Sequence, residues 1–220
     1  MVLPILKTQY VMKNRSILLS FLMILFLTGA SLAQQNSGTM NAGTTANVGK
    51  ESKSEFDSQN QKGAAAVGAV SATGAKLSSA DQRLMLEVAM GGMMQLEVSK
   101  VALQKATNPE VRELAQAEVD EQTGLSAKLK EIADAKGITL PASPDPETQA
   151  MVTKLQSMSG VALDKMYVSE SGVKGHQKLD KVMSTVESNA SDASLIGVAK
   201  AAHPLIKFHL TVAKQIKDKR

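Results

Sequence analysis

The sequence contains no cysteine and no tryptophan, and it has only two tyrosines and four phenylalanines. Without cysteine there can be no disulfide, no thiolate nucleophile, no thiolate metal ligand and no lipid anchor on a cysteine after a leader. So few aromatic side chains cannot build the stacking surfaces that many single-strand nucleic-acid binders use. These absences exclude several classes of enzyme and binding protein at the outset.

An excess of one charge is also missing from most of the chain. The formal net charge is +4, but Lys7, Lys13 and Arg15 lie in an N-terminal segment without acidic residues. Over residues 81–220 the basic and acidic residues are equal in number. A near-neutral domain without a basic stripe offers no electrostatic attraction for nucleic acid. We therefore expect no nucleic-acid partner.

Motifs of common catalytic sites are absent too. The chain has no G-x-S-x-G nucleophile motif and no glycine-rich phosphate loop, and its serines fall mainly in expected caps and linkers. No pairing of a nucleophile with a base stands out. The sequence therefore favours a protein without enzymatic activity.

The N-terminus has the pattern of a secretory signal peptide. Lys13 and Arg15 precede an apolar run over residues 17–27, and a small-x-small site ends at Ala33. We expect a signal peptide over residues 1–33, with a natural start at Met12 and Sec-type export to the periplasm or beyond the cell. The run is shorter than the roughly twenty residues of a membrane-spanning helix, so no span is expected after cleavage. An N-terminal anchor that is retained is the alternative.

Residues 34–78 are rich in Gly, Ala, Ser, Thr, Asn and Gln and have almost no large apolar side chains. Such a composition buries too little apolar surface to offset the entropy of ordering. We expect a disordered low-complexity linker here, followed by one folded domain over residues 79–220.

The folded domain shows helical periodicity throughout, because its apolar residues recur at alternating spacings of three and four. The second helix is the best delimited, since Asn108 can cap it, Pro109 suits its first position and Gly137 can end it. No stretch alternates with period two for long enough to predict a strand. The long helices are expected over residues 80–106, 108–136, 161–188 and from 192 onward, with a short helix over 146–158.

The connections between these helices predict a ferritin-like four-helix bundle in an all-α fold. Short joins make the first and second helices antiparallel, and likewise the third and fourth. The middle connection is long and carries the short extra helix, so it can return along the bundle and leave the second and third helices parallel.

Polar residues interrupt the apolar seams at similar levels of the bundle, notably Glu118 and Gln122 on the second helix. Inward carboxylates and imidazoles can bind iron, manganese or zinc. The chain lacks the Glu-x-x-His pair of such sites, so we favour a buried polar layer that fixes helix register and predict no cofactor. Candidates for a divalent metal are Glu97, Glu118, Glu121, His176 and His209, and the further polar residues expected in the core are Gln122, Tyr167 and Glu170.

A cluster of methionines allows one further metal. Met90, Met93 and Met94 lie at helical spacing, and thioethers can hold cuprous ion. Methionine at this spacing is more commonly a core residue that fills gaps. We therefore favour the core role over a copper site.

Residues 81–214 resemble the bacterial envelope family called domain of unknown function 4142. The matching segments are AMGGMMQLEVSKVALQKATNPEVRELAQAEVDEQT, GITLP, MSGVALDKMYVSES and HPLIKFHL. The resemblance implies a ferritin-like bundle exported to the envelope, with no established activity. The family's tyrosine and two of its histidines match Tyr167, His176 and His209. Where the family reads Asp-(Asp/Glu)-His-Thr this chain has Gln122 in place of histidine, which argues against a metal because a neutral amide is a poor ligand.

Three hypotheses follow. The first is an exported envelope protein that acts as a non-enzymatic structural or binding module. The second is a metal-binding or metal-dependent oxidoreductase-like bundle. The third is an interaction module with an apolar groove for a partner helix. An envelope protein or a small molecule is the expected partner.

Overall fold

The computed structural model describes residues 46–219, so the expected signal peptide lies outside the described residues. The described chain is an all-α bundle with one small hairpin, and none of its helices is both long and apolar enough to cross a membrane. Its elements are β1 (Asn47–Val48), β2 (Glu51–Ser52), α1 (Lys53–Gly68), α2 (Ser79–Lys105), α3 (Pro109–Lys136), α4 (Pro146–Gln156), α5 (Gly160–Tyr167), the π-helix η1 (Val168–Gly175), α6 (His176–Asn189) and α7 (Ala193–Asp218).

Local capping fixes the helix ends where the sequence predicts them. The side chain of Asn108 accepts a hydrogen bond from the backbone N–H of Val111 at 3.1 Å, and Pro109 opens α3. Gly137 ends the same helix in the left-handed conformation with φ of 68°. Asp192 caps α7 in the same manner as Asn108 caps α3.

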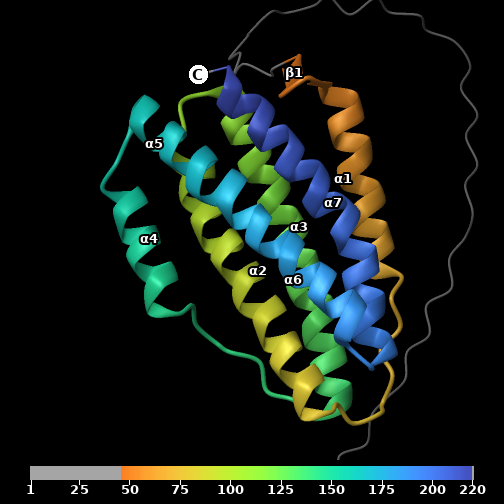
Figure 1. Cartoon of the computed structure of the whole chain (residues 1–220). Coiled ribbons are helices and arrows are strands. Elements are labelled where there is room, and N and C mark those ends of the chain that lie inside the picture. The colour runs from red at the N-terminus through yellow and green to blue at the C-terminus, as the bar shows by residue number, and fades with distance from the viewer. Residues whose placement is uncertain (1–45, 220) are drawn as a thin grey trace, which may run out of the picture. The chain divides into compact units, whose positions relative to one another are not determined.

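The long helices form a bundle in which α2 runs antiparallel to α3 and to α6, and α7 runs antiparallel to α3 and to α6, whereas α1 runs parallel to α3 (Figure 1). The carboxylate of Asp164, near the start of α5, accepts hydrogen bonds from the backbone N–H groups of Thr107 and Asn108, just before α3. At the other end, the N–H of Ser191 donates to Asp81 at the start of α2. The continuous run α5–η1–α6 is therefore parallel to α3 and antiparallel to α2, with α4 on the long connection, as expected.

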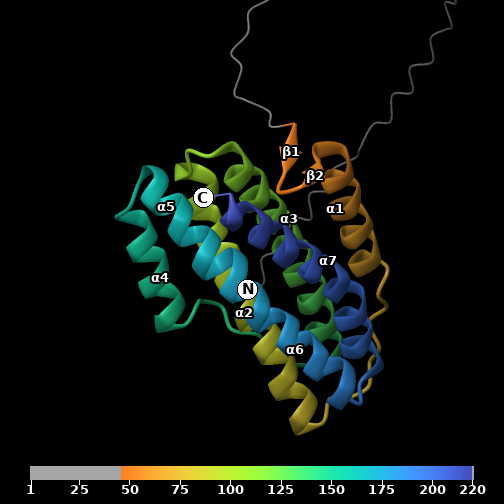
Figure 2. The same ribbon diagram turned by 45° about the horizontal axis from the view of Figure 1, so that its top comes forward.

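Helix α1 is the main departure from expectation. It packs against α3 and α7, and Phe56 and Val67 are buried there (Figures 1 and 2). The expected disordered linker over residues 34–78 is therefore wrong for the part that the structure describes, residues 46–78, and the fold begins before residue 79. The segment contains few large apolar side chains, but Phe56, Val67 and Leu77 are all buried, so tertiary packing stabilises a segment whose local composition predicts no structure.

The connecting segment over residues 69–78, which leads from α1 into α2, is also bound to the bundle. The ammonium of Lys136 donates to the carbonyl oxygens of Thr73 at 2.7 Å and Ala75 at 3.1 Å, and to the carboxylate of Asp192 at 2.7 Å. Both charged groups of the Lys136–Asp192 pair are buried. This pairing offsets the cost of burying either charge alone.

The core consists of two hydrophobic clusters along the bundle axis. One includes Val98, Leu114 and Val212, and the other includes Met85 and Leu129. Buried polar residues separate the two clusters on the long helices: Gln95 on α2, Glu118, Glu121 and Gln122 on α3, His176 at the start of α6 and His209 on α7. The interior is therefore interrupted at mid-length by a polar layer.

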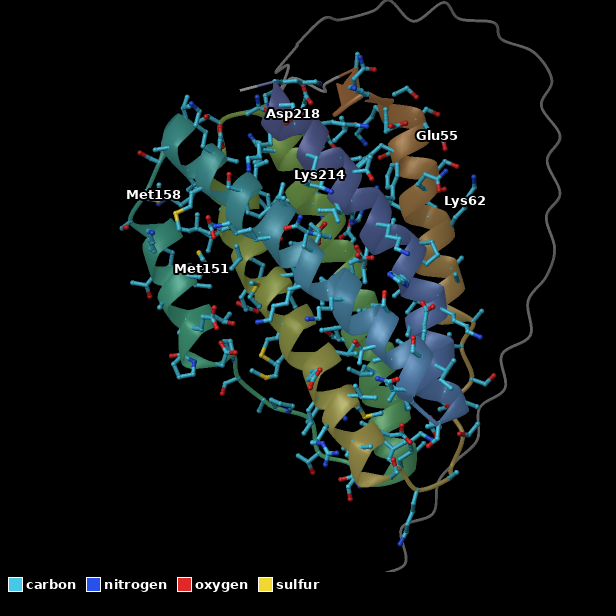
Figure 3. All side chains as sticks on the ribbon, viewed as in Figure 1. Glu55, Lys62, Met151, Met158, Lys214 and Asp218 are labelled. Atoms are coloured by element: carbon cyan, nitrogen blue, oxygen red, sulfur yellow. The ribbon has the colours of Figure 1, made fainter. Side chains whose placement is uncertain are left out.

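The outer faces carry charged side chains. Figure 3 shows Glu55 and Lys62 on α1, and Lys214 and Asp218 on α7, all of which are exposed. The polar layer at mid-length is thus distinct from the solvated surface, since its members come from the inner faces of the same helices.

Candidate metal centre

Helix α3 directs two carboxylates into the bundle. Glu118 and Glu121 lie three residues apart, which places them on one face of the helix. Glu118 is fully buried and Glu121 is 6% exposed. A buried carboxylate needs a cation, a proton or hydrogen bonds to offset its desolvation.

Two histidines face these carboxylates from other helices. His176 opens α6, His209 lies in α7, and both are fully buried. Each of the four side chains offers a ligand atom, and these atoms all lie within 4.8 Å of one another. The two rings meet nearly edge to face, with centroids 6.0 Å apart.

The contacts between these groups are short, but they do not have the geometry of hydrogen bonds. Oε1 of Glu118 lies 2.6 Å from Nε2 of His176 and 3.0 Å from Nδ1 of His209. Nδ1 of His209 is also 2.7 Å from Oε2 of Glu121. None of these carboxylate oxygens and ring nitrogens has a hydrogen-bond partner in residues 46–219. The four side chains thus bring oxygen and nitrogen atoms together in one small buried volume, an arrangement that could hold a cation.

The outer nitrogen of His209 is held in a defined protonation state. The amide nitrogen of Asn60 donates to the backbone carbonyl of Phe56 at 2.9 Å, and a carbonyl can only accept. This fixes the amide, so Oδ1 of Asn60 is the atom that lies 2.6 Å from Nε2 of His209. Nε2 therefore carries a proton, and Nδ1, which faces Glu118 and Glu121, is the nitrogen that either takes up the second proton of the ring or offers its lone pair to a cation.

The π-helix η1 holds the ring of His176. Nδ1 of His176 lies 3.1 Å from the carbonyl oxygen of Ser171, five residues earlier, and 2.8 Å from the amide of Gln95. The hydroxyl of Ser171 in turn donates to Gln95 at 2.8 Å. Gly175 lets Gln95 approach closely, because a Cβ at that position would collide with the glutamine side chain. The nitrogen of the Gln95 amide, which donates to the carbonyl of Ser171 at 3.3 Å, is the atom beside Nδ1, so Nδ1 has both a donor and an acceptor next to it and either tautomer of the ring is accommodated. With its proton on Nδ1, the ring offers Nε2 as a ligand.

Two positive charges are needed to balance the two carboxylates of the cluster. Burial alone would raise the pKa of Glu118, but the charges of His176 and His209 outweigh it and lower that pKa to about 2. Burial alone would lower the pKa of His209, but the charges of Glu118 and Glu121 raise it to about 10. Burial would likewise lower the pKa of His176, but the charge of Glu118 outweighs this effect and raises that pKa. Two protons, or one divalent cation, would bring two carboxylates and two imidazoles to neutrality.

The structure brings together four of the five residues considered as metal ligands from the sequence. Glu97 does not join them, because it lies partly exposed and pairs with Lys100 at 2.7 Å. Glu170, expected in the polar core, is also partly exposed and pairs with Lys174 at 2.8 Å. The expectations for Glu97 and Glu170 are therefore wrong: both side chains point away from the polar layer.

Tyr167 and Gln122 are buried as expected. The hydroxyl of Tyr167 lies 2.9 Å from that of Ser99, and burial together with the charge of Glu118 raises the pKa of this tyrosine well above its usual value. The amide of Gln122 faces Gly92, and neither its nitrogen nor its oxygen has a hydrogen-bond partner among the described residues. Gln122 is therefore part of the polar layer but is not held by it.

Sequence reasoning missed the groups that hold the two histidines. Gln95 lies four residues before the inward-facing Ser99 on α2, and this helical spacing could have indicated it. Ser171 lies five residues before His176. Residues at this spacing lie one above the other in a π-helix but not in an α-helix, so the sequence did not indicate the contact. Nothing in the sequence indicated a role for Asn60, because the composition of its segment predicts a disordered linker.

The three methionines do not form one site. Met90 and Met94 line a cavity of about 340 Å³ between α2, α4 and α6, together with Met151. Met93 lines a different cavity, of about 420 Å³, against the loop after α3. The thioethers therefore do not converge as ligands of one copper ion would.

The fold and the cluster define a class: an all-α bundle with a Glu₂His₂ group in its interior. The chain belongs to the family described as "Domain of unknown function (DUF4142)", which it matches over residues 66–216. The match confirms the resemblance seen in the sequence and includes all four residues of the cluster. No curated protein and no solved structure matches the chain.

Proposed function

We propose that the protein binds one divalent transition-metal ion inside the bundle through Glu118, Glu121, His176 and His209. The observation that carries this proposal is the convergence of their buried oxygens and nitrogens at short distances without hydrogen bonds. Such contacts are unfavourable unless a positive charge lies among them. A divalent cation with two carboxylates and two neutral imidazoles gives a neutral, buried group.

The ligand set indicates which ions to expect. Imidazole nitrogen with carboxylate oxygen suits zinc, iron or manganese, and no sulfur is available in the cluster to select copper. The glutamine at position 122 does not remove the site, since four other ligands are present. The competing interpretation is a polar layer in which both imidazoles carry a second proton. The two interpretations differ only in whether one ion or two protons balance the carboxylates.

The biological setting is part of the proposal. We infer an exported protein of the bacterial envelope, on the support of the apolar N-terminal run and its small-x-small site. We infer a binding or structural role for the ion, because the sequence carries no recognised catalytic motif. The oxidoreductase-like and helix-groove hypotheses stay predictions, the latter with the cavity of about 340 Å³ between α2, α4 and α6 as its place.

Equilibrium metal binding tests the proposal. The chain is stripped with a chelator, and zinc, manganese and ferrous ion are titrated by calorimetry, with elemental analysis of the dialysed product. We expect one ion per chain. Glu118→Gln keeps the volume of the side chain and removes its charge, so it should abolish binding.

Glu97→Gln is the matched control. It makes the same chemical change on a glutamate that lies outside the cluster, so binding should be unchanged. A parent chain that binds none of the three ions, or a Glu97→Gln chain as impaired as Glu118→Gln, would contradict the proposal.

A further inference from the structure

One of the four proposed ligands reaches a cavity. Glu118, His176 and His209 have no exposed surface, whereas Glu121 lines a cavity of about 300 Å³. The cavity lies between α1 and α3 and is closed on one side by Leu205 of α7. The two methionine-lined cavities described above contain none of the four ligands.

The lining of this cavity combines small residues with acidic ones. Glycine and alanine keep it open on both walls, at Gly63 and Ala64 of α1 and at Gly124 of α3. Asp120 and Glu131 are exposed and flank Glu121 along α3. The one lysine of the lining, Lys128, is paired with Glu131 at 2.6 Å. The lining therefore has a net negative charge that extends from the surface to Glu121.

We propose that this cavity is the entrance through which a hydrated divalent cation reaches the centre. This inference rests on the proposed metal site. Asp120 and Glu131 raise the local concentration of cations at the surface, because field lines concentrate in a cleft lined by charge of one sign. Glu121 then binds the ion first, since it is the one ligand that the cavity reaches. One helical turn away, Glu118 and the two imidazoles complete the coordination as water leaves.

Helix α1 forms both the wall of the entrance and part of the site. Gly63 and Ala64 line the cavity, and Asn60, one turn earlier, fixes the ring of His209. The helix thus joins access to the ion and orientation of a ligand in one element. A chain in which α1 is displaced would open the centre and at the same time release His209.

The experiment plugs the cavity without disturbing the ligands. Gly124 lines the cavity, and a Cβ built on it meets nothing within 4 Å, so the first atom of a side chain fits there. Gly124→Leu fills the space, and Gly124→Ala is the control, since both replace glycine by a good helix former but alanine leaves the space open. Association of zinc is followed by stopped-flow with a zinc-sensitive dye, and release is followed after addition of excess chelator.

We expect Gly124→Leu to slow association and release by the same factor and to leave the equilibrium dissociation constant unchanged. A plug raises the barrier in both directions but leaves the bound state as it was. Gly124→Ala should match the parent. Gly68→Leu, from the opposite wall, where a built Cβ also meets nothing within 4 Å, should repeat the result and covers the case in which Gly124→Leu does not fold.

The charges give an independent readout. The double variant Asp120→Asn, Glu131→Gln should slow association about tenfold at low salt and reduce its salt dependence. If zinc associates with and leaves Gly124→Leu and Gly68→Leu at the same rates as the parent, the cavity is not the entrance. A parent that binds no ion in equilibrium titrations would instead refute the metal site itself, so the two failures are distinguishable.

Discussion

The side-chain oxygen of Asn60 lies 2.6 Å from Nε2 of His209, which joins α1 to the last helix of the bundle. Asn60 is itself fixed by its bond to the carbonyl of Phe56. Through this pair, a segment without any sequence signal for structure determines which nitrogen of His209 faces the carboxylates.

Asn60→Leu removes the acceptor at Nε2 and keeps the approximate volume of the side chain. The ring of His209 then loses its fixed orientation, and we expect the affinity for the ion to fall about 10–100-fold. Competition with a chelator of known affinity measures the change. Gln59→Leu, at the preceding position of the same helix, is the control, because its amide hydrogen-bonds to Glu55 on the surface of α1 rather than to His209. Equal affinities for the parent and Asn60→Leu would show that His209 needs no such support.

Two buried glutamines of the polar layer should respond in opposite ways to replacement by leucine. Neither amide atom of Gln122 has a partner among the described residues. Gln122→Leu should therefore raise the free energy of unfolding by about 1–3 kcal/mol, the cost of an unsatisfied buried polar group. Chemical denaturation measures it, and metal binding should be retained. A stable Gln122→Leu chain that no longer binds the ion would show that this amide contributes to the site.

Gln95 is the matched comparison, because its amide contacts Ser171 and His176. Gln95→Leu leaves the hydroxyl of Ser171 without its acceptor and should lower the free energy of unfolding by about 1–3 kcal/mol. Measured in the same denaturation experiment, a loss of stability in Gln122→Leu equal to that in Gln95→Leu would contradict the difference between the two amides.

The metal-free chain should be most stable in mildly acid solution. The pKa of His209 is raised from 6.5 to about 10, so its contribution is complete below pH 6.5 and is lost as pH rises through about 10. The pKa of Glu118 is lowered from 4.5 to about 2, so its contribution is complete above pH 4.5 and is lost as pH falls through about 2. Thermal unfolding with excess chelator should therefore show a maximum between pH 4.5 and 6.5.

The metal-loaded chain should behave differently at the alkaline side of this range. The ion competes with protons for the imidazoles, so its stabilising effect should grow as pH rises, up to about pH 10, where His209 of the metal-free chain loses its proton. Binding near neutral pH should release about two protons, which calorimetry in buffers of different ionisation enthalpy detects. Stability curves of the same shape with and without the ion would contradict metal binding at these histidines.

The position of α1 in the folded unit is open to a separate test. Phe56 is buried, with its ring centroid 5.8 Å from that of Phe208. Phe56→Ala should lower the free energy of unfolding by about 3–5 kcal/mol. Val161→Ala is the control, since Val161 is 62% exposed. If Phe56→Ala has no effect, residues before 79 are not part of the cooperative fold.

Local signals in the sequence account for the helices that were predicted correctly. Asn108, Pro109 and Gly137 each act on backbone groups within a few residues, so α3 has the same ends in the sequence and in the structure. The inward placement of Glu118, His176 and His209 follows from helical periodicity, which also depends on near neighbours alone.

Glu97 shows where this reasoning fails. Counting residues from a turn gives the height of a side chain along a helix but not its direction around the axis. At 3.6 residues per turn, Gln95 and Glu97 point about 200° apart, so one enters the polar layer and the other faces outward. The packing of α2 against its neighbours decides which of the two is buried.

By itself, the sequence determined that the chain forms an all-α bundle, where its long helices begin and end, and which polar residues lie at mid-length. These properties depend on capping, periodicity and the lengths of connections, which are local. Only the tertiary structure decided that Glu121 joins the cluster, that Glu97 and Glu170 do not, and that α1 belongs to the fold. Each of these outcomes depends on contacts between residues distant in sequence: α1 has few apolar residues and is stabilised by packing against α3 and α7.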